Sequence, residues 1–310
     1  LKVLKIPVPI AADLINLLSS AASALLIFKI GREFKSKGLG LMVAFFYVFI
    51  PHFWINMATG METMFTIFLS LLLIRLDMKE RPVLSGLAAS ALLLTRIDGL
   101  ALVAAVLLVR FFKKPKQALI CAGVIILTQL PWLIFCLFYF GSVVPQSITA
   151  KRLIHALPPF MVLMKYLQWF LGLGIRSGHL QLSYPDLFIF TALAVIGSAR
   201  ALIRERWALV FALWIIFSVS GMVPAAATPF FWYKIPMLTG YMFLVAIGIE
   251  TISGLANRLH RFLGPALNFI IPAVLVLRAL SYYSSDFFQG YTAKEKVNFK
   301  LAELIKSRAT

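Results

Sequence analysis

The stretch LGLMVAFFYVFIPHFWINMATGMETMFTIFLSLLLIRL, residues 39–76, is almost entirely apolar but too long for a single membrane helix. As one helix it would extend roughly 57 Å, whereas the hydrocarbon of a bilayer is about 30 Å thick. Pro51 and Gly60 interrupt the run near its middle, and both residue types break helices. The stretch therefore predicts two membrane helices joined by a turn, with one carboxylate, Glu62, close to that turn.

Apolar runs of this kind fill most of the chain. Of its 310 residues 61% are hydrophobic and 14% are charged, and the mean hydropathy is +0.91, which excludes an ordinary soluble domain. Runs of about 17 to 25 residues match membrane helices, whereas barrel strands would alternate over about ten residues. We predict an all-α, polytopic transmembrane bundle of about ten spans, at residues 9–29, 39–56, 62–76, 82–95, 98–112, 118–139, 186–202, 206–223, 234–255 and 264–282.

The net charge of +18 does not indicate a nucleic-acid-binding protein, because the Lys and Arg residues are spread over loops instead of forming one basic face. The most basic loops fall on alternate connections. By the positive-inside rule these loops face the cytoplasm, and the other connections lie on the outer face. The basic loops are residues 29–38, 75–82, 110–116, 200–206 and 257–261.

The connection 140–185 is too long for a tight turn and contains an apolar stretch interrupted by Lys165 and Gln168. We predict an interfacial or re-entrant segment near 157–175, because a true span there would invert the sidedness of every later loop. The bundle then covers residues 1–283. Residues 284–310 form an amphipathic tail on the outer side, which either begins a truncated soluble region or lies over the outer face.

Three charged residues, Glu62, Arg96 and Asp98, lie at the predicted outer tips of helical hairpins. A charge inside a span costs a few kcal/mol unless it is paired or lines a wet cavity. Two interpretations follow from the residues alone. Arg96 is either a structural tie that pairs locally with Asp98 or Glu62, or part of an active site.

The segment YFGSVVPQSITAKR, residues 139–152, leaves a membrane helix at the outer face. Ser147, Thr149 and Lys151 would project hydroxyls and an ammonium group just above the bilayer, where they suit a phosphate at the level of the lipid headgroups. A simple interfacial anchor would have the same composition, so both readings stay open.

The segment PFFWYKIP, residues 229–236, places Lys234 at the mouth of another predicted helix, where it is the only cation. Trp232 and Tyr233 suit an interfacial aromatic belt, which is enough to explain them. The four histidines are scattered, and the chain has no paired-Cys spacing and no HExxH motif. We therefore predict no metal site and no cofactor.

Four segments, in this order, resemble those of polytopic glycosyltransferases of the GT-C type, which use lipid-linked sugars, above all the bacterial arabinofuranosyltransferase-like and mannosyltransferase-like proteins. The resemblance implies transfer of a sugar from a polyprenyl-phosphate donor to a glycan, lipid or protein acceptor. The reaction would take place on the noncytoplasmic face of a bacterial cytoplasmic membrane. The segments are TGMET (59–63), LLLTRIDGL (92–100), YFGSVVPQSITAK (139–151) and FFWYKIP (230–236).

The resemblance also implies roles for individual residues. Cations that meet the departing phosphate lower the barrier, and Lys151, Lys234 and Arg96 are the candidates. In the family, an acidic residue of the first outer loop deprotonates the acceptor. This chain begins at what resembles the second membrane segment, so we expect the first helix and that loop to be missing and assign no catalytic base. Glu62 is expected to hold outer-face cations such as Arg96, or to bind a sugar hydroxyl.

Two other functions remain open. A polytopic transporter or lipid flippase would place charges in the middle of its spans, whereas the charges here lie near the outer ends of the predicted helices. A noncatalytic membrane scaffold would account for the composition and the topology, but not for the order of the four segments.

Overall fold

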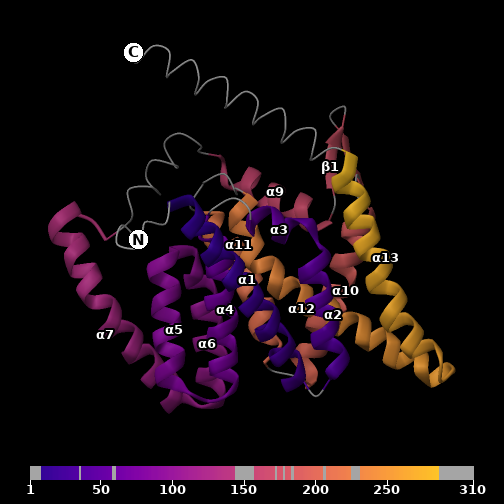
Figure 1. Cartoon of the computed structure of the whole chain (residues 1–310), viewed down its shortest axis with the longest axis horizontal. Helices are drawn as coiled ribbons and strands as arrows, with labels where there is room; N and C mark the ends of the chain where they lie inside the picture. Colours follow the sequence, from indigo (N-terminus) through magenta and orange to yellow (C-terminus); the bar gives the residue numbers. More distant parts are fainter. Residues whose placement is uncertain are drawn as a thin grey trace, which may run out of the picture.

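The computed structural model describes a bundle of helices (Figure 1). The predicted all-α helical bundle is thereby confirmed in its main feature, and its long apolar helices are compatible with an integral membrane protein. The described residues are 8–34, 36–57, 61–143, 157–171, 173–176, 179–182, 185–204, 207–224 and 231–285.

The helices follow one another with short connections over most of the described chain. Two short strands, β1 (Leu173–Arg176) and β2 (His179–Leu182), interrupt the series. The helices are α1 (Val8–Glu33), α2 (Lys37–Phe49), α3 (Pro51–Met57), α4 (Thr63–Met78), α5 (Pro82–Thr95), the 3-10 turn η1 (Ile97–Gly99), α6 (Leu100–Lys113), α7 (Pro115–Phe140), α9 (Pro159–Leu171), α10 (Pro185–Arg204), α11 (Leu209–Met222), α12 (Phe231–Leu259) and α13 (Leu263–Ser285).

Fewer helices than predicted have the length of a membrane span. Four described helices are long and apolar enough, in α1, α7, α12 and α13, or five if the bent pair α2 and α3 counts as one span. The prediction of about ten spans is therefore not confirmed. The reason is length: α4 has 16 residues, and α5, α6 and α11 have 14 each, fewer than the roughly 20 needed to cross hydrocarbon.

Proline and glycine set several helix ends, as their backbone chemistry requires. Pro82 and Pro115 lie at the start of α5 and α7, where a missing N–H removes no helical hydrogen bond. Gly141 closes α7 in the left-handed conformation, with a φ of 69°. Pro51 opens α3 at an angle of 60° to α2, so the predicted span 39–56 is two helices.

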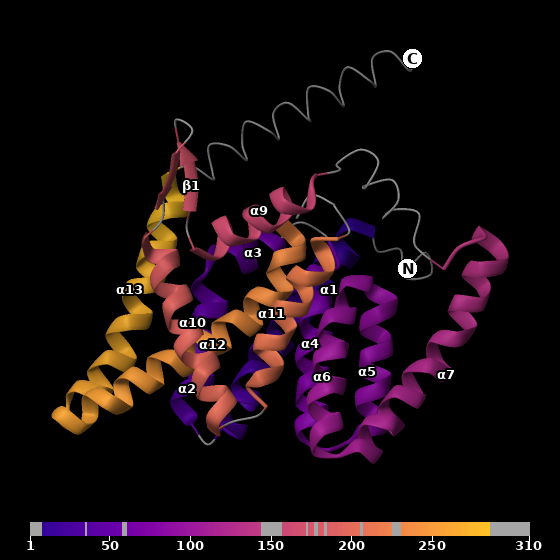
Figure 2. The same ribbon diagram turned by 180° about the vertical axis from the view of Figure 1, so that it is seen from behind.

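Helix α12 lies at the centre of the bundle, and most of its apolar length is buried. Helices α7 and α13, at opposite sides of the bundle in Figures 1 and 2, expose most of theirs. Helices α10 and α12 pack closely against each other. There, a Cβ atom added to Gly248 would lie 2.0 Å from the carbonyl oxygen of Leu193, so only glycine allows this approach.

Helix α9 lies across one end of the bundle, which we call the α9 end (Figures 1 and 2). The interfacial or re-entrant position predicted for the segment near 157–175 stays a prediction. The antiparallel hairpin that follows, with Leu173 opposite Leu182, was not predicted. Most of the predicted tail 284–310 lies outside the described residues, since α13 ends at Ser285, and the division of the chain at residue 283 stays a prediction.

The opposite end of the bundle, where α1 and α4 finish and α5 and α7 begin, is held by ion pairs, and we call it the basic end. Glu33 of α1 accepts hydrogen bonds from Arg75, at 2.5 Å, and from Lys79, at 2.9 Å. Lys114 pairs with Glu80 at 2.5 Å and lowers the pKa of that carboxyl. These contacts join three of the basic loops predicted to face the same side.

Candidate functional site

At the α9 end, Arg96 is held between Glu62 and Asp98, and we call these three residues the carboxylate clasp. Arg96 donates from Nε and Nη2 to the two carboxylate oxygens of Asp98, at 3.0 and 3.2 Å, and from Nη1 to Oε1 of Glu62, at 3.0 Å. The Arg96 side chain is 5% exposed, whereas that of Glu62 is 47% exposed. Each of the three guanidinium nitrogens therefore donates one hydrogen bond to a carboxylate, and the formal charge of the three side chains together is −1.

The local sequence explains this geometry. Arg96 has an extended backbone after α5, and η1 follows at once, which brings Asp98 back to its guanidinium. Gly99 allows this turn to press against α5, because an added Cβ would lie 2.6 Å from Cγ of Leu92. Glu62 precedes α4, and its side chain makes no capping hydrogen bond to the helix, so it can reach Arg96.

The two carboxylates favour the charged state of Arg96. Burial opposes the charge of Arg96, but Asp98 and Glu62 outweigh this effect, so the pKa of the guanidinium lies above its ordinary value. The charge of Arg96 is thus stabilised although its side chain is buried. The local ion pair of Arg96, which was one of the two interpretations of the sequence, is observed. Both Glu62 and Asp98 take part in it.

The clasp contacts the start of α12 through an aromatic ring. The Arg96 guanidinium lies 4.9 Å from the ring centroid of Tyr233, a distance suited to a cation–π interaction. The next residue, Lys234, places its Nζ 5.8 Å from the ring centroid of Tyr166 and 5.5 Å from that of Trp169, both in α9. We call Lys234 with these two rings of α9 the lysine site.

Lys234 differs from Arg96 in having no carboxylate partner within ion-pair distance among the described residues. Its strongest charged neighbour is another cation, Lys165 of α9, which repels it. Lys234 is partly buried. A partly buried ammonium group that faces aromatic rings and a second cation is ready to accept an anion.

The clasp and the lysine site lie side by side. Burial raises the pKa of Tyr166, and the negative charge of Asp98 adds to this effect, as does Tyr233. Tyr166 is also one of the rings next to Lys234. A net negative group and a net positive group therefore share one rim of the bundle.

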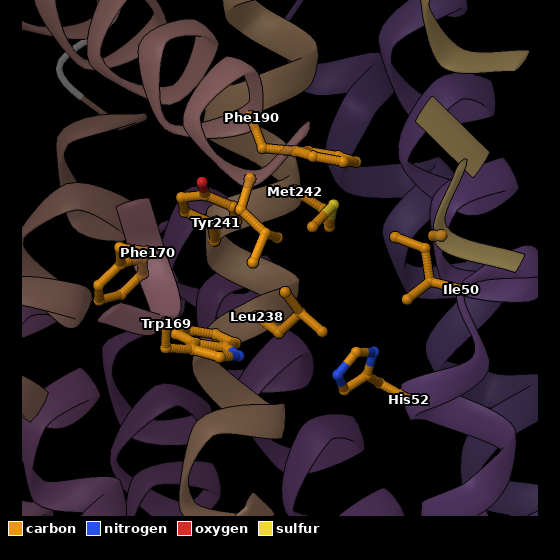
Figure 3. A pocket seen from close by; sticks show the side chains of 10 residues that line it. Ile50, His52, Trp169, Phe170, Phe190, Leu238, Tyr241 and Met242 are labelled. Atoms are coloured by element: carbon orange, nitrogen blue, oxygen red, sulfur yellow. The ribbon is translucent and has the colours of Figure 1, made fainter. Parts of the chain in front are cut away.

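A small apolar cavity lies beneath the lysine site. Its volume is about 70 Å³, roughly half that of an engineered cavity that binds benzene, so it is too small and too apolar for a sugar. In Figure 3, His52 and Trp169 lie along one edge of the cavity with Leu238 between them. The other lining residues are Ile50, Phe170, Leu187, Phe190, Tyr241, Met242 and Ala279.

The structure brings together four predicted residues that come from distant parts of the chain. Glu62, Arg96 and Asp98 form the clasp, and Lys234 lies next to it across Tyr233. The other three predicted residues lie in the segment 144–156, outside the described residues: Ser147, Thr149 and Lys151.

The site also contains residues that were not predicted, namely His52, Tyr166, Trp169 and Lys165. One sequence signal was present: Lys165 interrupts an apolar stretch and precedes Trp169 by four residues, a spacing that puts both on one helix face. In the described part of the chain, no three His, Cys, Asp or Glu side chains gather as a metal site would require.

Comparison of this chain with known proteins identifies no relative. No known protein family, no curated protein and no solved structure matches this chain.

Proposed function

We propose that the chain is a membrane glycosyltransferase that moves a sugar from a polyprenyl-phosphate donor to a glycan, lipid or protein acceptor. One observation carries the proposal. Three of the four segments that resemble GT-C enzymes contribute to one site: TGMET supplies Glu62, LLLTRIDGL supplies Arg96 and Asp98, and FFWYKIP supplies Lys234. A scaffold protein would have no need for these distant segments to meet.

The charges of the site suit the proposed reaction. When the bond between the sugar and the phosphate breaks, negative charge grows on the departing phosphate, and a nearby cation stabilises that charge most in the transition state. Lys234 is available for this role because no described carboxylate neutralises it. Its partly buried position strengthens the interaction relative to one in bulk water.

The same proposal includes a membrane orientation. The helices run back and forth between the basic end and the α9 end (Figure 1). We infer about ten crossings, with the helices whose apolar part is shorter, α4, α5, α6, α10 and α11, completed by their flanking turns. The basic end would face the cytoplasm by the positive-inside rule. The site would then lie on the noncytoplasmic face of a bacterial cytoplasmic membrane.

Sugar transfer tests the proposal directly. The chain, purified into lipid nanodiscs, is incubated with radiolabelled polyprenyl-phosphate arabinofuranose, mannose and glucose in turn, together with a bacterial envelope extract as acceptor. We expect one donor to pass its label to a product that resists mild acid, because a glycosidic bond is more stable than a sugar phosphate. Absence of transfer from every donor would overturn the proposal. In a parallel experiment with the chain reconstituted into sealed lipid vesicles, movement of intact donor across the bilayer would favour a flippase.

Replacement of Lys234 by glutamine should weaken binding of farnesyl phosphate, a short polyprenyl phosphate, by about 10- to 100-fold. The estimate corresponds to one charge-assisted hydrogen bond of about 1.5–3 kcal/mol. Microscale thermophoresis with the nanodisc protein measures the affinity. The matched control is Lys114→Gln, the same substitution at a lysine of the basic end. This variant should bind farnesyl phosphate with the affinity of the wild type. Equal affinity of all three proteins would contradict a phosphate role for Lys234.

A further inference from the structure

The corner between α12 and α13, residues 254–263, projects from the bundle, and we call it the elbow. In Figures 1 and 2 it lies beyond the other helices, at the level of the basic end. Every residue of α12 from 235 to 249 is buried, whereas every residue of the elbow is exposed except Ala256, which is partly buried. Helix α13 turns back tightly, because a Cβ atom added to Gly264 would lie 2.8 Å from the carbonyl oxygen of Ser253. The side chains of the elbow are therefore free to meet whatever surrounds the bundle.

Large apolar side chains cover the elbow. Leu259 is 84% exposed and Phe262 is 62% exposed, and Leu255 and Leu263 are exposed as well. Four such side chains within nine residues would be unfavourable in water. The acyl chains of a bilayer would remove this cost.

The elbow is also cationic. Arg258 and Arg261 are exposed, and the guanidinium carbon of Arg261 lies 4.8 Å from the centroid of the Phe262 ring. The sequence contains no Asp or Glu between residues 251 and 285. No described carboxylate lies within ion-pair distance of either arginine.

Elsewhere at the basic end, carboxylates balance several of the cations. Glu33 pairs with Arg75 and Lys79, and Glu80 pairs with Lys114. The two arginines of the elbow have no such partner in the described part of the chain, so their charge is available to an anion from outside the protein.

We propose that the elbow binds anionic phospholipids, with their phosphate groups on Arg258 and Arg261 and their acyl chains on Leu259 and Phe262. A guanidinium group stays charged and binds a phosphate through paired hydrogen bonds. Segments that join cations to large apolar side chains lie at the boundary between headgroups and acyl chains. The contact of Arg261 with Phe262 places a cation and an apolar ring together, as this boundary requires. The proposal does not depend on sugar transfer.

Lipid bound at the elbow would also set the depth of α12 in the bilayer. Helix α12 has 29 residues and extends about 43 Å, so it connects the lysine site at its start with the elbow at its end. Headgroups that hold the elbow in one leaflet thereby fix the level of Lys234 near the other.

Lipid binding by the full chain in detergent tests the proposal. Native mass spectrometry measures the dissociation constants of dioleoylphosphatidylglycerol, which is anionic, and of dioleoylphosphatidylcholine, which is zwitterionic. We expect the wild type to prefer the anionic lipid by about 25-fold, because each arginine near a lipid surface contributes about fivefold. The double variant Arg258→Gln with Arg261→Gln should lose this preference. The matched control is Lys79→Gln with Lys114→Gln, two paired cations of the basic end, which should keep it.

A second double variant tests the apolar part of the elbow. Leu259→Ser with Phe262→Ser should weaken the binding of both lipids by about tenfold, because contacts with acyl chains do not depend on the headgroup. All four substituted side chains are exposed, so these variants should fold, and thermal unfolding checks this.

Three results would overturn the proposal. The first is equal affinity of the wild type for the two lipids, and the second is an unchanged preference in the arginine double variant. The third is unchanged affinity of the Leu259→Ser, Phe262→Ser variant for both lipids. The same spectra give the mass of the complex. A dimer that this variant alone loses would assign the elbow to a second copy of the chain and would also overturn the proposal.

Discussion

Replacing Gly248 by alanine is expected to force α10 and α12 apart and to leave little folded protein. The added methyl carbon would lie 2.0 Å from the carbonyl oxygen of Leu193 and 2.8 Å from its carbonyl carbon, both backbone atoms that cannot rotate away. The contact is reciprocal, because a Cβ on Gly197 of α10 would lie 1.9 Å from the carbonyl oxygen of Leu244 in α12. Small residues allow such approaches between membrane helices.

The expected loss of stability is about 3 kcal/mol or more, at the upper end of the range for overpacked cores. Thermal unfolding in detergent, followed by size-exclusion chromatography with fluorescence detection, measures the change. The matched control is Gly254→Ala in the same helix, where an added Cβ meets nothing within 4 Å. Because alanine is a better helix former than glycine by up to about 1 kcal/mol, this control should be slightly more stable than the wild type. A Gly248→Ala protein with unchanged unfolding would contradict the close packing of α10 on α12.

The sequence predicted the helical class and several helix boundaries because these depend on local chemistry. Pro82 and Pro115 stop one helix and open the next, so α5 and α7 begin close to their predicted positions. The contact between Gly197 and Gly248 could not be predicted in the same way. In a membrane protein the surfaces that face lipid and those that face other helices are both apolar, so the apolar pattern does not tell which helices pack together.

In the candidate site, too, contacts between residues close in the sequence could be predicted, whereas contacts between distant segments could not. The pair of Arg96 with Asp98 is two residues apart, and the charges alone suggested it. The rings next to Lys234 come from α9, more than sixty positions earlier in the chain, and no local pattern connects them to α12. The predicted number of about ten spans is not confirmed, because several apolar runs form helices shorter than a full crossing, four of them with 14 to 16 residues.

The basic end contains an ion pair that is far more buried than the others and is not part of the candidate site. Arg110 of α6 pairs with Asp77 in the last turn of α4, and also donates to the backbone carbonyl oxygen of Asp77. The two side chains are 2% and 1% exposed, whereas those of Lys114 and Glu80 nearby are about half exposed. Water therefore cannot replace Arg110 as the partner of Asp77.

Arg110→Leu should consequently destabilise the protein by about 3–5 kcal/mol, because it leaves the Asp77 carboxylate buried without its cation. The double variant Asp77→Leu with Arg110→Leu should recover most of this loss, since apolar side chains of similar volume can replace a buried ion pair at little cost. Thermal unfolding of both variants in detergent measures the difference, with Lys114→Leu as the control for an exposed pair, where only a small change is expected. If the double variant were as unstable as Arg110→Leu alone, the pair itself would be indispensable. Recovery would instead show that each of the two charges is needed only because the other one is buried beside it. The packing of α4 on α6 would then depend on the shape and the burial of apolar side chains, not on the ion pair.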